Sequence, residues 1–358
     1  MVKSIFATLM SLILVGCSAS ELTVEQKAAK LLVVGVIGNT LNDDNPIIRD
    51  IEERGISGVI LFENNISPEG DSRAKLRRFI DDIQSKSDTP LFVAIDQEGG
   101  LVNRLKSKYG FADMPSQQMV ASARRADYAN EVAALIASEV ASIGVNINFT
   151  PCVDLNINPD SPAIGRVNRS FSDDEQRVVD LATIYVEEHR KRGVITSLKH
   201  FPGHGSAKVD SHLGLTDITT TWEKRELIPY REMIASGNCD MVMVSHLYHH
   251  DIDSIYPASL SKKSIDGLLR TELGWDGVVV SDDMQMRAIT DEYGFADAVI
   301  MGLNAGVDLF VFSRFSNSSD IAGEFIDVIS EGVKSGKISE ERLNQAVERV
   351  LTLRKKVR

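Results

Sequence analysis

Cysteine is scarce in this chain, as are proline and aromatic residues. The 358 residues include 3 cysteines, 10 prolines and 6% aromatic residues. So few cysteines exclude a disulfide-rich scaffold, and the low proline content, with only 25 glycines, excludes a collagen-like or disordered chain. Lysine and arginine number 39 against 51 aspartates and glutamates, so the formal charge is −12. This charge argues against a surface that binds nucleic acid or anionic lipid.

Apolar runs long enough for a polytopic membrane protein are also missing. The first run, Ile5 to Gly16, spans twelve residues after Lys3, whereas a bilayer span needs about 20. It therefore predicts a signal peptide over residues 1–16. Its end, Leu14-Val15-Gly16-Cys17, resembles the lipobox of bacterial lipoproteins, in which Cys17 becomes the acylated N-terminus. An ordinary secretory signal with a chance cysteine is the alternative.

The lipobox resemblance implies a protein held in the cell envelope by the lipid on Cys17, followed by a short tether over residues 17–22. Ser18 is compatible with the periplasmic face of the outer membrane in a two-membrane host. Two thiols then remain, Cys152 and Cys239. Oxidising conditions permit a disulfide between them, but nothing in the sequence places them close together, and two buried free thiols are the other possibility.

Eight short runs rich in valine and isoleucine alternate with segments of helical period. The runs are Leu31–Val36, Gly58–Phe62, Leu91–Ile95, Val145–Phe149, Val194–Leu198, Met241–Ser245, Gly277–Val280 and Val307–Phe312. They are apolar almost throughout, as expected for parallel strands covered on both faces. Eight such units favour a closed (β/α)8 barrel of the TIM type over an open doubly wound sheet. Glycine-rich or lysine-containing phosphate loops are absent, so nucleotide binding has no support.

Helix boundaries are marked along the chain. Capping boxes are predicted at Thr23 with Gln26 and at Ser172 with Glu175, and Asn45 precedes a first-turn proline. Helix ends are predicted at Gly55, Gly144, Gly193, Gly237 and Gly274. Only 46 residues follow the last strand, enough for helices at 321–334 and 339–357. We therefore expect a single domain over residues 23–358.

Polar residues gather where the predicted strands end. The segments are Asp96-Gln97-Glu98-Gly99-Gly100, Pro151-Cys152-Val153-Asp154, Lys199-His200-Phe201-Pro202-Gly203-His204-Gly205, His246, and Ser281-Asp282-Asp283. In a closed parallel barrel these positions share one rim, where active sites of this architecture lie. The sequence therefore predicts a catalytic rim.

Lys199-His200-Phe201-Pro202-Gly203-His204-Gly205, followed after four residues by Asp210-Ser211-His212, resembles the signature of glycoside hydrolase family 3. The branch it is similar to is the single-domain bacterial β-N-acetylglucosaminidases, or β-hexosaminidases, in their lipoprotein form. Asp96-Gln97-Glu98-Gly99-Gly100 and Ser281-Asp282-Asp283-Met284 match two further segments of that family in the same order. The resemblance implies removal of terminal β-linked N-acetylglucosamine without a cofactor.

A retaining glycosidase needs a carboxylate nucleophile and a proton donor. Asp282 ends a buried strand, and the resemblance selects it as the nucleophile over Asp283, which we expect to cap a helix or bond beneath the rim. The family's proton donor is a histidine on a loop, here His212, with Asp210 accepting from its other ring nitrogen. The sugar-binding residues implied by the resemblance are Asp96, Arg104, Arg169, Lys199 and His200.

One residue and one loop depart from the family pattern. Leu101 stands where arginine is frequent, and the loop 164–171 is longer than the shorter family form, so that Arg169 is chosen over Arg166. His246 either lines the site, as a sugar-binding residue, or braces a neighbouring loop, and His204 is expected to stabilise its own loop.

The predicted function is hydrolysis of terminal non-reducing N-acetylglucosamine from peptidoglycan fragments or chitin-type oligosaccharides through a glycosyl-aspartate. The alternatives are phosphorolysis, because histidine does not repel an incoming phosphate as a carboxylate does, and a non-catalytic lipoprotein that binds glycan. A metal site made of His200, His204, Asp210 and His212 is disfavoured because Pro202 and Gly203 prevent a helical histidine pair. We expect a monomer with a glycan and the bilayer as its partners, and no nucleic acid.

Overall fold

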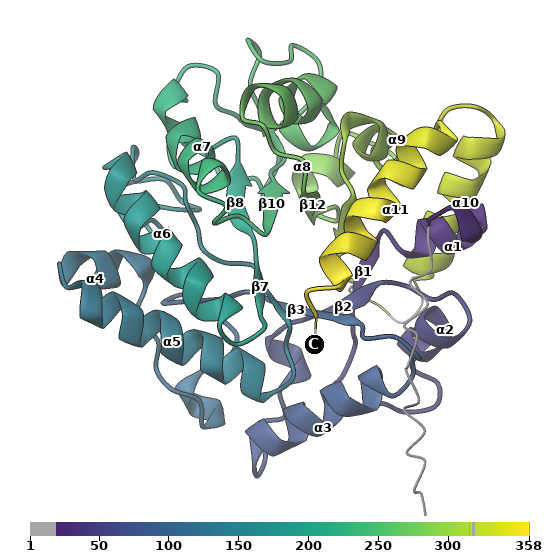
Figure 1. The fold of residues 1–358 in the computed structure, drawn as a ribbon, viewed down its shortest axis with the longest axis horizontal. Coiled ribbons are helices and arrows are strands. Elements are labelled where there is room, and N and C mark those ends of the chain that lie inside the picture. Colours follow the sequence, from purple (N-terminus) through teal and green to yellow (C-terminus); the bar gives the residue numbers. More distant parts are fainter. Residues whose placement is uncertain (1–18, 315, 317–318, 358) are drawn as a thin grey trace, which may run out of the picture.

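The structure is a computed structural model of the chain, and it describes residues 19–314, 316 and 319–357. A parallel sheet curls into a barrel with helices around it (Figure 1). The strands, in their order around the sheet, are β7 (Ile195–Thr196), β6 (Ile147–Asn148), β3 (Phe92–Ile95), β2 (Gly58–Leu61), β1 (Leu32–Gly35), β13 (Leu309–Phe312), β12 (Val278–Asp283), β10 (Met241–Val244) and β8 (Leu198–Phe201).

The ring closes through a broken strand. β7 pairs with β6, where Ile195 lies opposite Ile147, and β8 pairs with β10, where Leu198 lies opposite Val242. β7 lies within the fifth predicted run, Val194–Leu198, and β8 begins at the last residue of that run. The two strands are separated only at Ser197, whose backbone N–H donates to the carbonyl of Thr150. The nine assigned strands thus occupy eight strand positions, and the predicted (β/α)8 TIM-type barrel is confirmed.

Helices cover the outside of the barrel. They are α1 (Val24–Ala29), α2 (Pro46–Glu52), α3 (Ser72–Gln84), α4 (Gln117–Ser122), α5 (Ala126–Ser142), α6 (Glu175–Arg190), α7 (Ile228–Ala235), α8 (Arg287–Thr290), α9 (Phe295–Ala305), α10 (Ile321–Lys334) and α11 (Glu340–Arg354), with a π-helix at Lys263–Glu272. The strand residues are buried on both faces of the sheet, which explains why the runs are continuously apolar.

Helix α11 lies across the amino-terminal ends of the strands. Its Arg342 donates to the carbonyl of Val307 before β13, and its Arg354 donates to the carbonyl of Ser57 before β2. These bonds attach the last predicted helix to both sides of the barrel, so the C-terminal segment belongs to the same folded unit.

The predicted helix starts were right at two places and wrong at one. Thr23 and Gln26 form the capping box, and Asn45 accepts from the backbone of Ile47. The box at Ser172 was wrong, because the N-cap of α6 lies two residues later, at Asp174, whose side chain accepts from the backbone N–H of Arg177. All five glycines predicted to end helices have positive φ values, between 71° and 90°. Left-handed backbone at these positions favours glycine.

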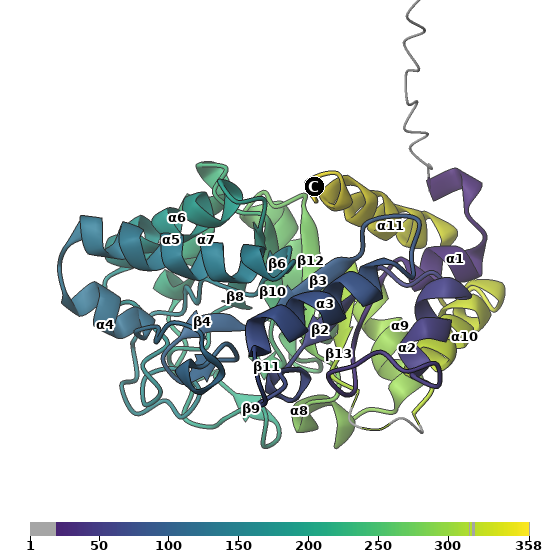
Figure 2. The same cartoon turned by 90° about the horizontal axis from the view of Figure 1, so that it is seen from below.

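Figure 2 shows the two ends of the barrel. The carboxyl-end loops, with β9 (Thr216–Asp217), β11 (Leu247–Tyr248) and α8, lie at the lower edge, whereas α11 and the C-terminus lie at the upper edge. The chain enters the described region at this upper edge, where the 3-10 turn Ala19–Glu21 packs on α11 and buries Ala19. Ala19 and Leu22 of the predicted tether are therefore packed on the body, while Cys17 lies outside the described residues.

Cys152 and Cys239 are both buried free thiols. Among the described residues, no helix combines the length and the apolar character needed to cross a bilayer. The predicted signal peptide, residues 1–16, falls outside this described part.

Candidate functional site

A cavity of about 410 Å³ opens at the carboxyl ends of the strands. Its volume falls within the range of small-molecule sites, roughly 300–1,000 Å³. Seven predicted site residues line it: Asp96, Arg104, Arg169, Lys199, His200, His212 and Asp282. They come from the carboxyl ends of four barrel strands, β3, β6, β8 and β12, or from the loops that follow them, so the barrel brings together residues that are almost 190 positions apart in the chain.

Lys199, on β8, is the centre of a buried network of charges. Its Nζ lies 2.8 Å from Asp96 Oδ1 and 2.7 Å from Glu98 Oε1. Arg104 adds a longer contact, with Nη2 3.5 Å from the other oxygen of Asp96. Burial lowers the pKa of Lys199, but the two carboxylates outweigh burial and raise it, so the lysine stays charged. The network presents both donors and acceptors to a polyhydroxylated ligand.

Glu98 was missed as a site residue by the sequence reasoning. It is almost fully buried in the middle of the short strand β4 (Gln97–Gly99) and holds two cavity cations, Arg169 and Lys199. Burial raises the pKa of Glu98, but these cations outweigh it and lower the pKa to about 2. The sequence feature that could have identified Glu98 is its position two residues after the predicted site residue Asp96. Arg166, the other arginine of the 164–171 loop, is exposed.

His200 is held by Asp154, a second residue that the sequence reasoning left without a role. Asp154 Oδ2 lies 2.7 Å from His200 Nδ1, and Arg169 Nη2 lies 3.0 Å from His200 Nε2. Since an arginine can only donate, Nε2 accepts and Nδ1 carries the proton that Asp154 accepts. Both nitrogens of His200 are therefore oriented before a ligand arrives.

Cys152, Asp154 and His200 are the described residues whose types and spacing come closest to a metal site. The Cys152 thiol lies 3.1 Å from Asp154 Oδ2, and His200 Nδ1 lies 2.7 Å from the same oxygen. Two ligands of one tetrahedral zinc keep a separation of about 3.3 Å, given metal–ligand bonds near 2 Å. Hydrogen bonds account for this cluster, and its geometry does not fit a zinc ion.

Asp282, on β12, faces the same cavity. Burial raises the pKa of Asp282, but the neighbouring rings of His200, His246 and His212 outweigh it and lower the pKa to about 2. The group is therefore an ionised carboxylate at neutral pH, able to act as a nucleophile or to stabilise positive charge. Its neighbour Asp283 instead accepts from two backbone N–H groups and also borders the cavity.

The loop after β8 carries the predicted acid and base. His212 Nδ1 lies 2.7 Å from Asp210 Oδ1, and the side chain of His212 is 62% exposed at the mouth of the cavity. A carboxylate on Nδ1 fixes the tautomer and leaves Nε2 to exchange protons with a ligand. Asp210 does not itself line the cavity.

His246 lies behind the cavity and is fully buried. Its Nε2 is 3.0 Å from the carbonyl oxygen of Asp283, and its Nδ1 is 2.7 Å from Ser259 Oγ. Since a carbonyl only accepts, Nε2 donates and Nδ1 accepts from the serine. Both ring nitrogens are thus used within the protein, an arrangement that braces the end of β12.

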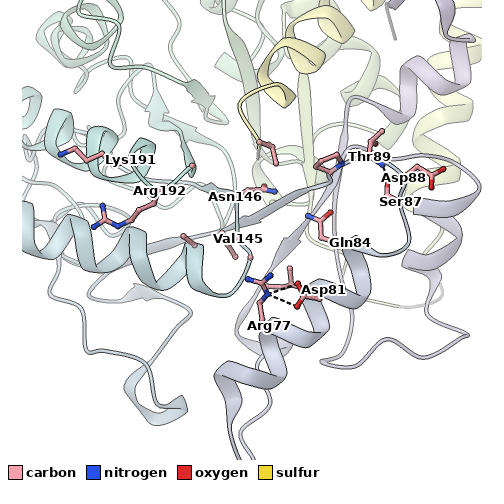
Figure 3. Close-up of a pocket in the computed structure, with 16 residues that line it drawn as sticks. Arg77, Asp81, Gln84, Ser87, Asp88, Thr89, Val145, Asn146, Lys191 and Arg192 are labelled. Carbon is pink, nitrogen blue, oxygen red and sulfur yellow. Dashed lines mark hydrogen bonds and ion pairs between the residues drawn. The ribbon is translucent and has the colours of Figure 1, made fainter. Parts of the chain in front are cut away.

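A larger hollow, about 660 Å³, lies at the opposite end of the barrel (Figure 3). Both of its arginines already have carboxylate partners close in sequence: Arg77 bonds to Asp81, and Arg192 to Glu188. Active sites of this architecture lie at the carboxyl ends of the strands. The smaller cavity is therefore the candidate site.

Comparison with known proteins supports this assignment. Residues 23–353 match the N-terminal domain of glycosyl hydrolase family 3. Beta-hexosaminidase A of Pseudoalteromonas piscicida is 34% identical over 331 residues, which are 86% of this chain and 54% of that protein. Beta-hexosaminidase LpqI of Mycobacterium tuberculosis is 31% identical over 345 residues, covering 93% of this chain and 83% of the relative.

A solved structure of similar fold is the family 3 beta-N-acetylglucosaminidase from a Paenibacillus species. It superposes with a TM-score of 0.85 at 36% identity, covering 94% of this chain and 62% of that one. The chain thus spans little more than half the length of some relatives and most of the length of others.

Proposed function

The chain belongs to glycosyl hydrolase family 3, and on that basis we propose that it is a retaining β-N-acetylhexosaminidase. The proposed substrates are peptidoglycan fragments or chitin-type oligosaccharides that end in a non-reducing β-linked N-acetylglucosamine. Relatives named beta-hexosaminidase and beta-N-acetylglucosaminidase support this substrate class.

The observation that carries the proposal is one cavity lined by an ionised Asp282 and by a histidine whose Nδ1 is paired with a carboxylate. In the first step, an oxygen of Asp282 bonds to the anomeric carbon while the glycosidic bond breaks. His212 Nε2–H donates its proton to the departing oxygen. The product of this step is a glycosyl ester on Asp282.

In the second step, His212 Nε2 removes a proton from water, and the water oxygen attacks the anomeric carbon. The ester bond to Asp282 breaks, and the sugar leaves with its original configuration after two inversions. Asp210 stabilises the charged imidazole whenever His212 holds two protons. Histidine and aspartate are thereby returned to their starting states.

The buried network holds the sugar in place. We assign hydroxyl binding to Asp96 as acceptor and to Lys199, Arg104 and Arg169 as donors, with His200 beside them. Because Glu98 holds Lys199 and Arg169 and Asp154 holds His200, the orientation of these three groups is fixed before the sugar binds. We assign His246 a bracing role behind Asp282.

We further propose that the protein is anchored through an acylated Cys17 with the cavity facing away from the bilayer. Ala19, two residues after Cys17, is buried on the face covered by α11, opposite the rim loops (Figure 2). A chain of two residues spans at most about 7 Å. Radiolabelled palmitate should therefore enter the wild type but not Cys17→Ala, and the anchored enzyme should still hydrolyse soluble substrates.

Covalent trapping tests the proposed function. A 5-fluoro N-acetylglucosaminyl fluoride should inactivate the enzyme, and peptide mapping should place the added sugar on Asp282. An adduct on another residue, or turnover with no adduct, would contradict the mechanism. Release of a sugar 1-phosphate in phosphate buffer would establish phosphorolysis instead. Comparing chitobiose with a disaccharide of N-acetylglucosamine and anhydro-muramic acid would identify the preferred glycan.

A further inference from the structure

The loop that carries Asp210 and His212 has an unusual pattern of exposure. Residues 208–215, all of them described, are exposed or half-buried except for Ser211. Ser211 is only 1% exposed although it lies directly between the two members of the dyad. Its side chain therefore points into the body of the protein, while Leu213 is 67% exposed at the rim.

Ser211 contacts a buried histidine. Its Oγ lies 3.1 Å from His204 Nε2, and the His204 ring is 2% exposed. His204 is in turn fixed through its backbone N–H, which donates to Asp154 Oδ1 at 2.7 Å. Asp154 is the carboxylate that orients His200, so the sugar-binding histidine and the catalytic loop share one buried attachment.

The base of this loop is packed too closely to shift. A Cβ on Gly205 would lie 1.6 Å from the carbonyl oxygen of Leu155, and a Cβ on Gly203 would lie 2.7 Å from Glu226 Cβ. The His204 ring also packs edge-on against His200, with centroids 5.8 Å apart. The base of the loop is thus rigid, and its tip is attached to that base by the contact between His204 and Ser211.

We propose that His204 and Ser211 are positioning residues that hold the dyad of Asp210 and His212 over Asp282. This inference rests on the proposed acid and base roles of that dyad. Ser211 adjoins both members, so fixing its side chain fixes the backbone on either side. Burial lowers the pKa of His204 to about 4, so its ring is neutral at physiological pH and the contact is a hydrogen bond between neutral groups. Displacement of a catalytic group by about 1 Å can cost 100-fold in rate.

The first test compares a substrate whose leaving group needs a proton with one whose leaving group does not. Ser211→Ala and His204→Phe should lower kcat/KM on chitobiose about tenfold, the effect of one lost hydrogen bond. Both variants should leave kcat/KM on the 2,4-dinitrophenyl glycoside within about twofold, because dinitrophenolate leaves without a proton. His204→Gln keeps an amide near the position of Nε2 and should restore most of the activity on chitobiose.

The control is Ser161→Ala. Ser161 is a buried serine of another rim loop whose hydroxyl has no hydrogen-bond partner among the described groups. This variant should match the wild type on both substrates. Equal losses on both substrates in Ser211→Ala, or no loss on chitobiose, would overturn the inference, since a merely structural defect does not distinguish leaving groups.

A second readout does not depend on catalysis. Chymotrypsin should cut after the exposed Leu213 or Leu215 about tenfold faster in Ser211→Ala and His204→Phe than in wild type or Ser161→Ala, as followed by mass spectrometry. Unchanged loop cleavage would overturn the positioning role even if the enzyme proved to have another activity. If the proposed function itself were wrong, a different result would show it: Asp282→Asn would keep full activity on chitobiose.

Discussion

Glu98 holds Arg169 by two parallel hydrogen bonds, from Nε to Oε2 at 2.9 Å and from Nη2 to Oε1 at 2.7 Å. The two residues are 71 positions apart and meet only because the loops after two neighbouring barrel strands share the rim. The carboxylate neutralises the arginine and orients Nη2, which also lies 3.0 Å from His200 Nε2, while Nη1 donates to the carbonyl of Ala163. A planar fork of this kind is specific to arginine.

Arg169→Lys should therefore lower kcat/KM on an aryl N-acetylglucosaminide by about 10- to 100-fold, because an ammonium cannot keep both bonds to Glu98 and still reach His200. Arg166→Lys, on the exposed side of the same loop, should have no effect. Equal kcat/KM values for the two variants would show that the paired hydrogen bonds between Arg169 and Glu98 do not contribute to sugar binding.

Asp282→Asn should reduce kcat by at least about 1,000-fold, because an amide oxygen cannot form the covalent intermediate. The matched control is Asp283→Asn. An asparagine there can still accept from the backbone of Gln285 and Ser313, so activity should stay within about tenfold of wild type. If instead Asp283→Asn were the inactive variant, the nucleophile would have been assigned to the wrong carboxylate.

Stability should fall in acid. The pKa of Glu98 is lowered to about 2 in the folded protein from an ordinary value of 4.5, because Arg169 and Lys199 outweigh its burial. A lowered folded-state pKa contributes stability that is present above the unfolded-state value and is lost as the pH falls toward 2. For a shift of this size the contribution is about 3 kcal/mol.

Glu98→Gln should accordingly lower the free energy of unfolding at pH 7, and the difference from wild type should shrink as the pH falls from about 4.5 to 2. Urea unfolding at pH 7, 4 and 2.5 measures this. The exposed Glu131→Gln should follow wild type at each pH. A difference that is constant over this range would show that the charge of Glu98 does not stabilise the fold.

Two glycines should respond to alanine in opposite directions. Gly205→Ala should destabilise the protein by at least about 3 kcal/mol, since its Cβ would overlap the carbonyl of Leu155. Gly267 lies within the helix Lys263–Glu272 with no atom near a Cβ, so Gly267→Ala should stabilise by about 0.5–1 kcal/mol. Thermal unfolding compares them, and equal melting temperatures would contradict the close packing of the loop base.

Most of the fold could be predicted from local pattern. The eight apolar runs, the glycine-terminated helices and the last two helices depend on residues close together in the chain, and the structure contains them all. The break of the fifth strand at Ser197 and the start of α6 at Asp174 could not be predicted. Both depend on which backbone and side-chain partners the barrel supplies, and the competing cap at Ser172 was equally good locally.

The sequence by itself determined the barrel, the rim segments and the candidate residues for the chemistry, because apolar period and motif spacing are properties of neighbouring residues. Only the tertiary structure decided which charged groups meet. It paired Glu98 with Arg169 and Lys199, attached Asp154 to His200, and placed His246 behind Asp282 with both nitrogens occupied. The contacts of Glu98 with Arg169 and Lys199, of Asp154 with His200 and of His246 with Asp283 join residues 37 to 101 positions apart. They exist because ring closure brings the ends of distant strands to one rim.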